Sequence, residues 1–291
     1  MKLGRTSIPV LAAFLFGCGV DAVGTPGGPS TETHPTTPTA PAPPSTDPPP
    51  PTPAPSTPSP TEPACNDGAL DFDGNGEIAT VPDSPALDLD GDFTVEAWIL
   101  PTSTAKGVEM VILSHHDAVA AQGWALRLQD GRFEIGVWGT EPGKIGYIAG
   151  NAGDAYVTPG KWTFVSGTLA GDTLRIYADG KLRDTQKLGV FFGRDKYRGP
   201  LAFGRAAYSA VAPFSGKIAE VRLSKTARFT ADTFQRPNSP FATDNTTVAL
   251  FPLDEPNGAT ISDTSGGGHN GVLADATQQP KRTPAPCVTT R

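Results

Sequence analysis

Two acidic runs in this chain contain the residue types that bind calcium. Asp71 to Gly76 reads D-x-D-x-N-G, like the first half of a calcium-binding loop between two helices. The twelfth position of such a loop supplies a bidentate carboxylate, and here it is Pro82. The second run, Asp88 to Asp92, would have alanine at both the first and the twelfth position. Neither run therefore predicts a helix–loop–helix calcium site.

His115-His116-Asp117 is the one other cluster whose residue types could do acid–base or metal chemistry. Adjacent residues of a strand point to opposite faces, so two neighbouring histidines make a poor single metal site. A serine nucleophile would need a histidine held beside it, and the other histidines, His34 and His269, lie in proline-rich and glycine-rich stretches. We interpret the cluster as the end of a strand entering a loop, and we predict that the chain is not an enzyme.

Cys18 follows a short apolar stretch, Ser7 to Phe16, which has basic residues before it. The stretch is shorter than the roughly 20 residues needed to span a bilayer and indicates an export signal. Leu15-Phe16-Gly17-Cys18 resembles the lipobox of bacterial lipoproteins, in which the cysteine is acylated and becomes the first mature residue. We therefore expect a signal peptide at residues 1–17 and a lipid on Cys18; the alternative is cleavage without a lipid. Gly19, where aspartate would mark inner-membrane retention, favours the outer membrane or cell surface.

Residues 18–64 are predicted to be the lipidated cysteine and a disordered linker. From Pro26 to Pro63, 16 of 38 residues are proline and most others are Ser, Thr or Ala, a composition that cannot bury a core. The whole chain has a formal net charge of −7 and no basic cluster. Nucleic acid is therefore a poor candidate partner, because phosphate binding needs clustered Lys and Arg. We expect membrane contact through the lipid anchor only.

Residues 65–291 have the pattern of one β-rich domain. Trp124 to Leu128 and Arg132 to Trp138 predict a hairpin across Asp130-Gly131, which supplies the positive φ angles of a tight turn. Many short strands separated by Gly and Pro turns indicate a two-sheet sandwich. Further strands are expected at 93–99, 162–169, 173–178, 214–223 and 248–253, and a short helix is expected at 230–236.

Four segments of this domain are similar to one known family. They are Ala69 to Pro101, Gly160 to Leu182, Phe214 to Thr230 and Phe251 to Leu273. They resemble the laminin-G-like, concanavalin-A-like jelly rolls, which implies an all-β, two-sheet antiparallel jelly-roll sandwich. The fourth segment usually precedes such domains and here it trails, so we expect it to complete a sheet beside Asp71-Phe72. That pairing would bring the chain ends together and favours a disulfide between Cys65 and Cys287; the alternative is two free thiols.

The resemblance also implies one structural calcium ion between the first strand, a loop and the late strand. Asp73 and Glu220 match two of those places, and Asp263 in the trailing segment could join them, with carbonyls and water completing the shell. The alternative is that Asp73 caps a turn and that Glu220 pairs with Arg222 or Lys217.

Glucanases of this fold carry their carboxylates as E-x-D-x-x-E on one strand, and this string does not occur in the sequence. We therefore favour binding over catalysis. Sugars stack on aromatic faces and hydrogen-bond to nearby polar groups, and the longest irregular stretches are 103–123 and 139–160. The expected ligand-binding residues are Trp138, as an exposed platform, with Tyr147, Tyr156, His116, Asp117 and Asn151, whereas Trp98 and Trp162 are expected in the core.

These observations predict a membrane-anchored surface lipoprotein with a non-catalytic domain that binds carbohydrate or glycoprotein. Two alternatives remain: a protein–protein adhesion or assembly module and a carbohydrate-active enzyme. Exposed aromatics in one groove would favour carbohydrate binding, and a flat apolar patch would favour protein–protein adhesion. Two close carboxylates in a cleft would favour an enzyme.

Overall fold

The computed structural model describes residues 68–104, 107–117, 120, 122–141, 144–150, 156–189, 196–208 and 212–286. All of them belong to the second of two compact units, Pro58–Arg291. The signal peptide, Cys18, the linker, Asn151 and the cysteines 65 and 287 lie outside the described residues. No helix in the described part of the chain is long and apolar enough to cross a membrane.

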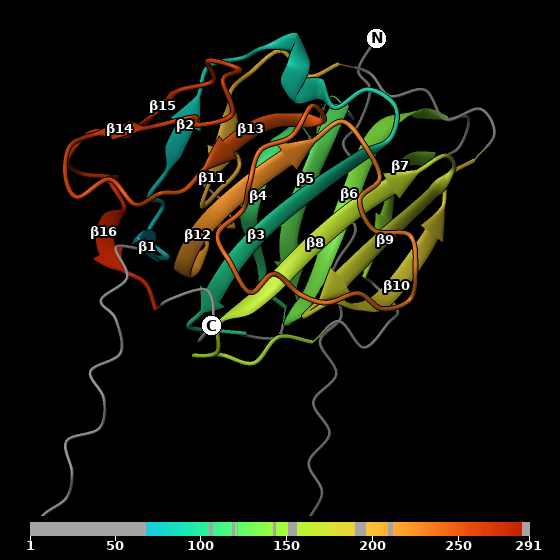
Figure 1. Cartoon of the computed structure of the whole chain (residues 1–291), viewed down its shortest axis with the longest axis horizontal. Coiled ribbons are helices and arrows are strands. Elements are labelled where there is room, and N and C mark those ends of the chain that lie inside the picture. Colours follow the sequence, from blue (N-terminus) through green and yellow to red (C-terminus); the bar gives the residue numbers. More distant parts are fainter. Residues whose placement is uncertain are drawn as a thin grey trace, which may run out of the picture. The chain divides into compact units, whose positions relative to one another are not determined.

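The first sheet runs in the order β10-β9-β8-β3-β12-β1-β16, with β13 also paired to β12. Its pairings are antiparallel. Figure 1 shows β3, β8 and β12 side by side across its middle. Its strands are β1 (Gly68–Asp73), β3 (Phe93–Pro101), β8 (Thr163–Ala170), β9 (Thr173–Ala178), β10 (Lys181–Lys187), β12 (Ser215–Ser224), β13 (Thr247–Phe251) and β16 (Lys281–Pro284).

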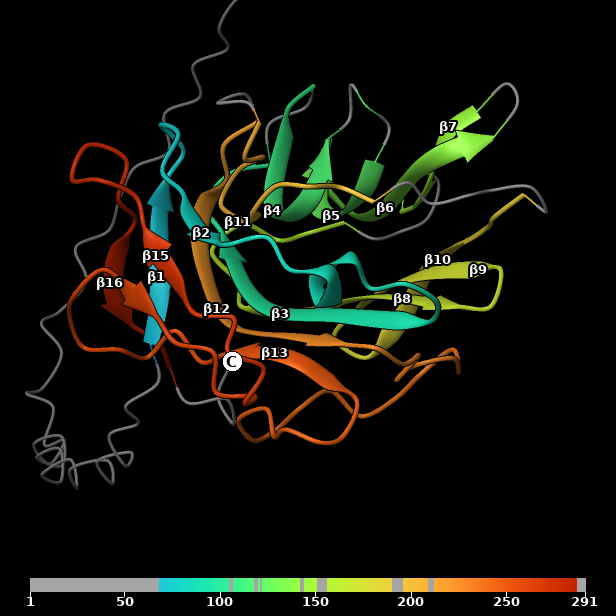
Figure 2. The same cartoon turned by 90° about the horizontal axis from the view of Figure 1, so that it is seen from above.

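The second sheet runs in the order β14-β15-β2-β11-β4-β5-β6-β7 and is also antiparallel. Figure 2 shows the two sheets as separate layers, which confirms the two-sheet sandwich. A short 3-10 turn, η1 (Pro85–Asp88), is the only helical element among the described residues. The strands are β2 (Ala79–Val81), β4 (Glu109–Asp117), β5 (Gln122–Gln129), β6 (Arg132–Glu141), β7 (Lys144–Ala149), β11 (Leu201–Phe203), β14 (Thr260–Ile261) and β15 (Gly271–Leu273).

One apolar core fills the space between the sheets. Alternate residues of each strand point into it, as the period of two requires, for example Phe93 and Val95 of β3 and Phe133 and Ile135 of β6. The two layers lie close together at Gly167 of β8, where an added Cβ would lie 2.8 Å from Cβ of Ile135. A glycine is therefore needed at this position for the sheets to pack.

The hairpin predicted across Asp130-Gly131 is confirmed, and the strands expected at 162–169 and 173–178 also form a hairpin. β8 pairs with β9 across Gly171-Asp172. β5 and β6 pair across Asp130 (φ 52°) and Gly131 (φ 76°). Positive φ at both central residues is the geometry of a tight hairpin turn. The register of β5 and β6 follows directly from it and places Arg127 opposite Glu134.

A segment after β12 covers the outer face of the first sheet with a second apolar cluster. Phe229 and Phe234 stack with their ring centroids 3.7 Å apart, and Phe164 of β8 meets both. The helix predicted at 230–236 is wrong. Its backbone pairs instead with the β9–β10 turn, where Phe234 N donates to Gly180 O and Leu182 N donates to Asp232 O, both at 2.8 Å.

The trailing segment, Phe251 to Leu273, does not pair beside Asp71-Phe72 as predicted, because its strands β14 and β15 join the second sheet. β13 pairs with β12, and β14 and β15 extend the second sheet beside β2. The strand beside β1 is β16, whose register pairs Gly68 with Pro284 and Asp71 with Lys281. Gly68 lies three residues after Cys65, and Pro284 lies three residues before Cys287.

Candidate functional site

The outer face of β4, β5 and β6 carries most of the chemically useful side chains that strand alternation turns away from the core. Leu126 and Leu128 of β5 belong to the core, so Arg127 between them points outward. In β6, Ile135 and Val137 point inward, so Glu134 and Trp138 point outward. Unlike the first sheet, whose outer face is covered by the aromatic cluster around Phe164, this face holds mainly polar and aromatic groups.

A glycine in β5 brings two rings together across this face. His116 of β4 pairs with Gly123, and Gly123 pairs with Trp138 of β6. Because Gly123 has no side chain, the His116 and Trp138 rings meet over β5 with centroids 4.4 Å apart. Gly123 also has φ +84°, and an added Cβ would lie 1.9 Å from His115 O, so no other residue fits there.

The indole of Trp138 packs directly against two glycines, Gly136 and Gly146. A Cβ added to Gly136 would lie 2.5 Å from the indole, and one added to Gly146 of β7 would lie 3.0 Å from it. His116 packs on the ring, and the Arg127 guanidinium lies 5.6 Å from its centroid. Trp138 is consequently only 6% exposed, so the prediction of an exposed platform is wrong.

Tyr208, in the connection between β11 and β12, covers His116. Its ring meets the imidazole edge-on at 5.4 Å, and its hydroxyl lies 3.5 Å from His116 Nε2. Tyr208 is 41% exposed, whereas His116 is buried. Burial, and secondly the charge of Arg127, lower the pKa of His116 to about 4, so the imidazole is neutral at pH 7.

A charged trio lies beside the indole. Arg127 Nε donates to Glu134 Oε2 at 2.9 Å, and Nη1 donates to Glu109 Oε1 at 2.8 Å. Glu134 is buried, and Glu109 is partly exposed. Burial raises the pKa of Glu134, while the neighbouring Arg127 opposes that rise.

Tyr156 marks the other end of the face. Its backbone forms an isolated antiparallel β-bridge with Arg132 at the start of β6, and the Arg132 guanidinium lies 4.7 Å from the centroid of the Tyr156 ring. Tyr156 is 59% exposed. Arg132 and Trp138 are six residues apart on one strand, so the face is roughly 20 Å long. We call it the aromatic strip, made of Glu109, His116, Arg127, Arg132, Glu134, Trp138, Tyr156 and Tyr208.

The structure places the remaining predicted ligand residues elsewhere. Tyr147 of β7 points into the core, so its predicted contact with a surface ligand is wrong. Asp117 ends β4, and its Oδ1 accepts from Ala120 N at 3.1 Å, in agreement with a strand end entering a loop. Trp98 and Trp162 are buried, as predicted.

Sequence reasoning missed the charged trio and Tyr208. The hairpin register around Asp130-Gly131 carried a usable signal, because a two-residue turn sets Arg127 opposite Glu134. Tyr208 had no such signal, since its contact with His116 joins residues 92 positions apart.

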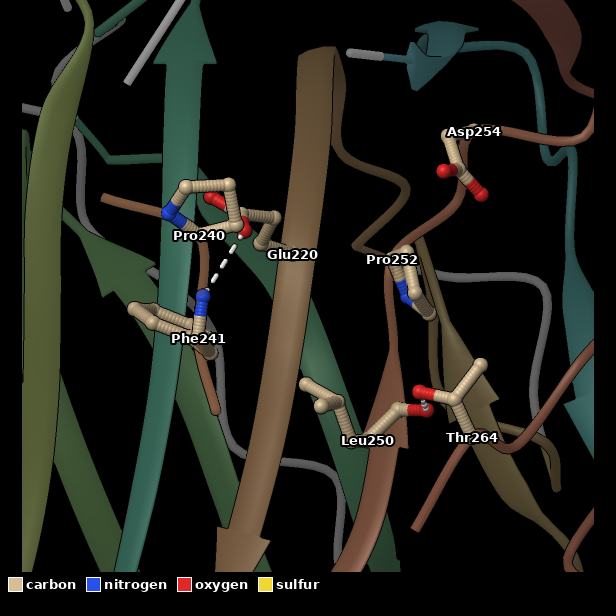
Figure 3. Close-up of a pocket in the computed structure, with 7 residues that line it drawn as sticks. All are labelled: Glu220, Pro240, Phe241, Leu250, Pro252, Asp254 and Thr264. Atoms are coloured by element: carbon tan, nitrogen blue, oxygen red, sulfur yellow. Dashed lines mark hydrogen bonds between the residues drawn. The ribbon is translucent and has the colours of Figure 1, made fainter. Parts of the chain in front are cut away.

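The residues proposed for calcium do not share a site. Asp73 Oδ1 accepts from Asn75 N at 2.8 Å, which lowers the pKa of Asp73 and caps a turn. Asp263 accepts from the backbone N–H groups of Leu250, Ser265 and His269. Glu220 lies in a pocket beside Phe241 (Figure 3). The described residues contain no group of three or more His, Cys, Asp or Glu that could hold a metal ion, so the calcium prediction has no ligand set here.

A family model of laminin G type, described as the concanavalin A-like lectin/glucanases superfamily, matches residues 73–251. Comparison with curated protein sequences gives no match.

Solved structures resemble this chain at the level of fold. A candidate carbohydrate-binding protein from Bacteroides ovatus matches with a TM-score of 0.52 and 18% identity, over 75% of this chain and 59% of that protein. The chain therefore spans less than two thirds of that protein's length. The heptameric SAP-like pentraxin of Limulus polyphemus matches with a TM-score of 0.41 and 17% identity, over 56% of this chain and 78% of the pentraxin. Domains LG4–5 of the mouse laminin alpha1 chain match with a TM-score of 0.42 and 19% identity, over 59% of this chain and 46% of that one.

Proposed function

This chain belongs to the concanavalin A-like lectin/glucanases superfamily, and from that premise we propose that its sandwich is a non-catalytic binding domain for carbohydrate or glycoprotein. The observation that carries the proposal is the aromatic strip. It has an exposed tyrosine at each end, Tyr156 and Tyr208, and a row of charged groups between them.

The strip has the chemistry that sugars need. Their C–H faces pack on aromatic rings, and their hydroxyls both donate and accept hydrogen bonds. Tyr156 and Tyr208 supply exposed rings, and the partly exposed Glu109 supplies an acceptor beside Arg127. Trp138 and His116 contribute indirectly, because they form the rigid floor that holds Arg127 and Tyr208 in place.

A glycan array with the purified chain tests this proposal. For a bound glycan, Tyr156→Ala should weaken binding about two- to thirteenfold, which corresponds to the roughly 0.5–1.5 kcal/mol of an aromatic contact. Tyr156→Phe should keep most of the affinity, because it keeps the ring. Val272→Ala, which alters an exposed side chain of β15 at the other end of the sheet, is the matched control and should change nothing. If the folded chain binds no glycan, the carbohydrate proposal fails and a protein partner takes its place.

One observation favours a second candidate, a carbohydrate-active enzyme. Glu109 and Glu134 both bond to Arg127, so two carboxylates lie near each other, and burial raises the pKa of Glu134 as a general acid requires. Arg127 opposes that use, because its charge favours the ionised form of Glu134. Release of 4-nitrophenol from a panel of aryl glycosides, lost in Glu134→Gln, would establish hydrolysis. Recovery of a bound glycan unchanged after long incubation would support binding.

We further propose that the domain is tethered to the bacterial envelope by a lipid on Cys18 and held off the membrane by the proline-rich linker. The support is the apolar export signal and the lipobox-like segment that ends at Cys18. Metabolic labelling with an alkyne fatty acid should mark the wild-type chain and leave Cys18→Ser unlabelled. Equal labelling of both chains, or of neither, would contradict the anchor.

A further inference from the structure

A pocket separate from the aromatic strip lies on the outer side of β12 and β13 (Figure 3). Its volume is ≈ 190 Å³, enough for a small side chain or a short organic molecule. Figure 3 shows Glu220 on the side of Pro240 and Phe241, and Asp254 at the other end of the group. The lining residues are Glu220, Pro240, Phe241, Leu250, Pro252, Asp254 and Thr264.

A β-bulge turns Glu220 into this pocket. The register of β12 against β3 skips from Ala219 opposite Trp98 to Arg222 opposite Glu96, so β12 carries an extra residue. Bulges re-aim side chains in this way. Glu220 takes a left-handed φ of 41° at the bulge, and its Oε1 accepts from Phe241 N at 3.0 Å. The result is a carboxylate that is only 6% exposed at an apolar wall.

The rest of the pocket is apolar or acidic. Its lining contains two prolines, a phenylalanine and a leucine, and none of the lining residues is basic. The carboxylate of Asp254 is exposed and makes no hydrogen bond or ion pair within the described ranges. Arginines of β12 and β16 already have acidic partners, since Arg222 pairs with Glu96 at 2.7 Å and Arg282 pairs with Glu255 at 2.8 Å.

We propose that this pocket binds a primary ammonium group on a straight aliphatic stem, as in a lysine side chain or a short diamine. The stem packs on Pro240, Leu250 and Pro252, in the way that long basic side chains bury their methylenes along apolar surface. The ammonium donates to Glu220, because a charge-assisted hydrogen bond in apolar surroundings is stronger than one in water. Asp254 attracts the cation at the open side. This site is independent of carbohydrate binding on the aromatic strip.

Titration of the whole chain, with isotope-labelled methyl groups, tests the proposal by NMR. The probes are Nα-acetyl-lysine amide, 1,5-diaminopentane and the uncharged analogue Nα-acetyl-norleucine amide. At least one of the two amines should give saturable shifts at the methyl groups of Leu250 and Thr264, and the norleucine analogue should give none. Stronger binding of the lysine derivative would point to a protein partner, and stronger binding of the diamine to a small-molecule ligand.

Two isosteric variants distinguish the loss of a carboxylate charge from a loss of folding. Glu220→Gln keeps an acceptor for Phe241 N and should weaken amine binding about tenfold, as expected for loss of a charged hydrogen-bond partner. Asp254→Asn, on the surface, should weaken it about two- to fivefold, the range for exposed ion pairs. Asp232→Asn, an exposed acid beside β10, is the control for net charge and should leave binding unchanged. Equal shifts with the norleucine analogue, no shift with either amine, or unchanged amine binding in Asp254→Asn and in a folded Glu220→Gln would overturn the proposal.

Discussion

Replacing Arg127 with methionine should destabilise the domain in a pH-dependent way. The change leaves Glu134, whose side chain is 4% exposed, without its cationic partner, while the methionine retains most of the apolar stem. Breaking a buried ion pair from one side costs about 3–5 kcal/mol. The lower part of this range is expected here, about 3 kcal/mol, because Arg127 itself is 13% exposed. In a domain of this size the loss corresponds to a fall in Tm of roughly 10 °C.

The pH dependence follows from the protonation of Glu134. Burial raises the pKa of Glu134 in the folded state above its ordinary value, and the charge of Arg127 limits that rise. Without Arg127 the folded-state pKa rises further, so between the unfolded and folded pKa values the folded state binds more protons than the unfolded state. In that window stability falls as pH rises. The deficit of Arg127→Met against wild type should therefore be largest at pH 8 and should shrink as pH falls toward 5.

Urea denaturation at pH 5, 6, 7 and 8 measures this effect. In the wild type this range stays above the pKa of His116, about 4. Loss of Arg127 raises that pKa equally in the single variant and in the double variant described next, so the comparison between the two variants isolates Glu134. The matched control is the double variant Arg127→Met, Glu134→Met, which removes both charges. It should recover to within about 1 kcal/mol of wild type at every pH, because an apolar pair of similar volume replaces a buried ion pair at little cost. A deficit of the single variant below about 1 kcal/mol at pH 8, or one equal at pH 5 and pH 8, would refute the reasoning.

Three further predictions concern the chain ends, the floor of the strip and calcium. The pairing of β1 with β16 ends at Gly68 and Pro284, each three residues from a cysteine in the sequence. We therefore predict that unreduced peptide mapping finds Cys65 and Cys287 linked, and that Cys287→Ser costs about 5 kcal/mol in the chain-entropy model; two titratable thiols in the native protein would contradict the bridge. Trp138→Ala should lower the free energy of unfolding by about 3–5 kcal/mol because it empties a buried indole site; a near-wild-type urea midpoint would show that the ring is dispensable to the fold. If the chain holds the structural calcium that its sequence resemblance implies, its Tm should rise with added CaCl2 and fall in EDTA; equal Tm values in both would dismiss that ion.

Local sequence was enough to predict the elements whose hydrogen bonds are made by near neighbours. Asp130-Gly131 sets the turn and the register of β5 against β6, because only a few backbone conformations close a two-residue loop. The same reasoning failed for residues 230–236. Their composition allowed a helix, but Asp232 and Phe234 satisfy their backbone groups against the distant turn at Gly180.

The candidate site was predicted only in part, because its parts come from distant segments. His116, Trp138 and Tyr156 were expected near a ligand, and all three lie along one face. Their exposure was not predictable from their own neighbours in sequence. Trp138 is buried because Gly136 and Gly146 leave room for its ring and because His116 reaches it from another strand.

The sequence by itself determined that this chain has a β-sandwich after a proline-rich segment, since alternation, tight turns and composition are properties of short stretches. Its Asp130-Gly131 turn also sets the register that pairs Arg127 with Glu134. Only the tertiary structure decided which side chains share a surface and which are covered. Burial, ion pairing and the pKa of His116 depend on groups brought together through space from separate strands and loops. For the same reason Asp73, Glu220 and Asp263, which one resemblance placed together, lie in separate environments in the fold.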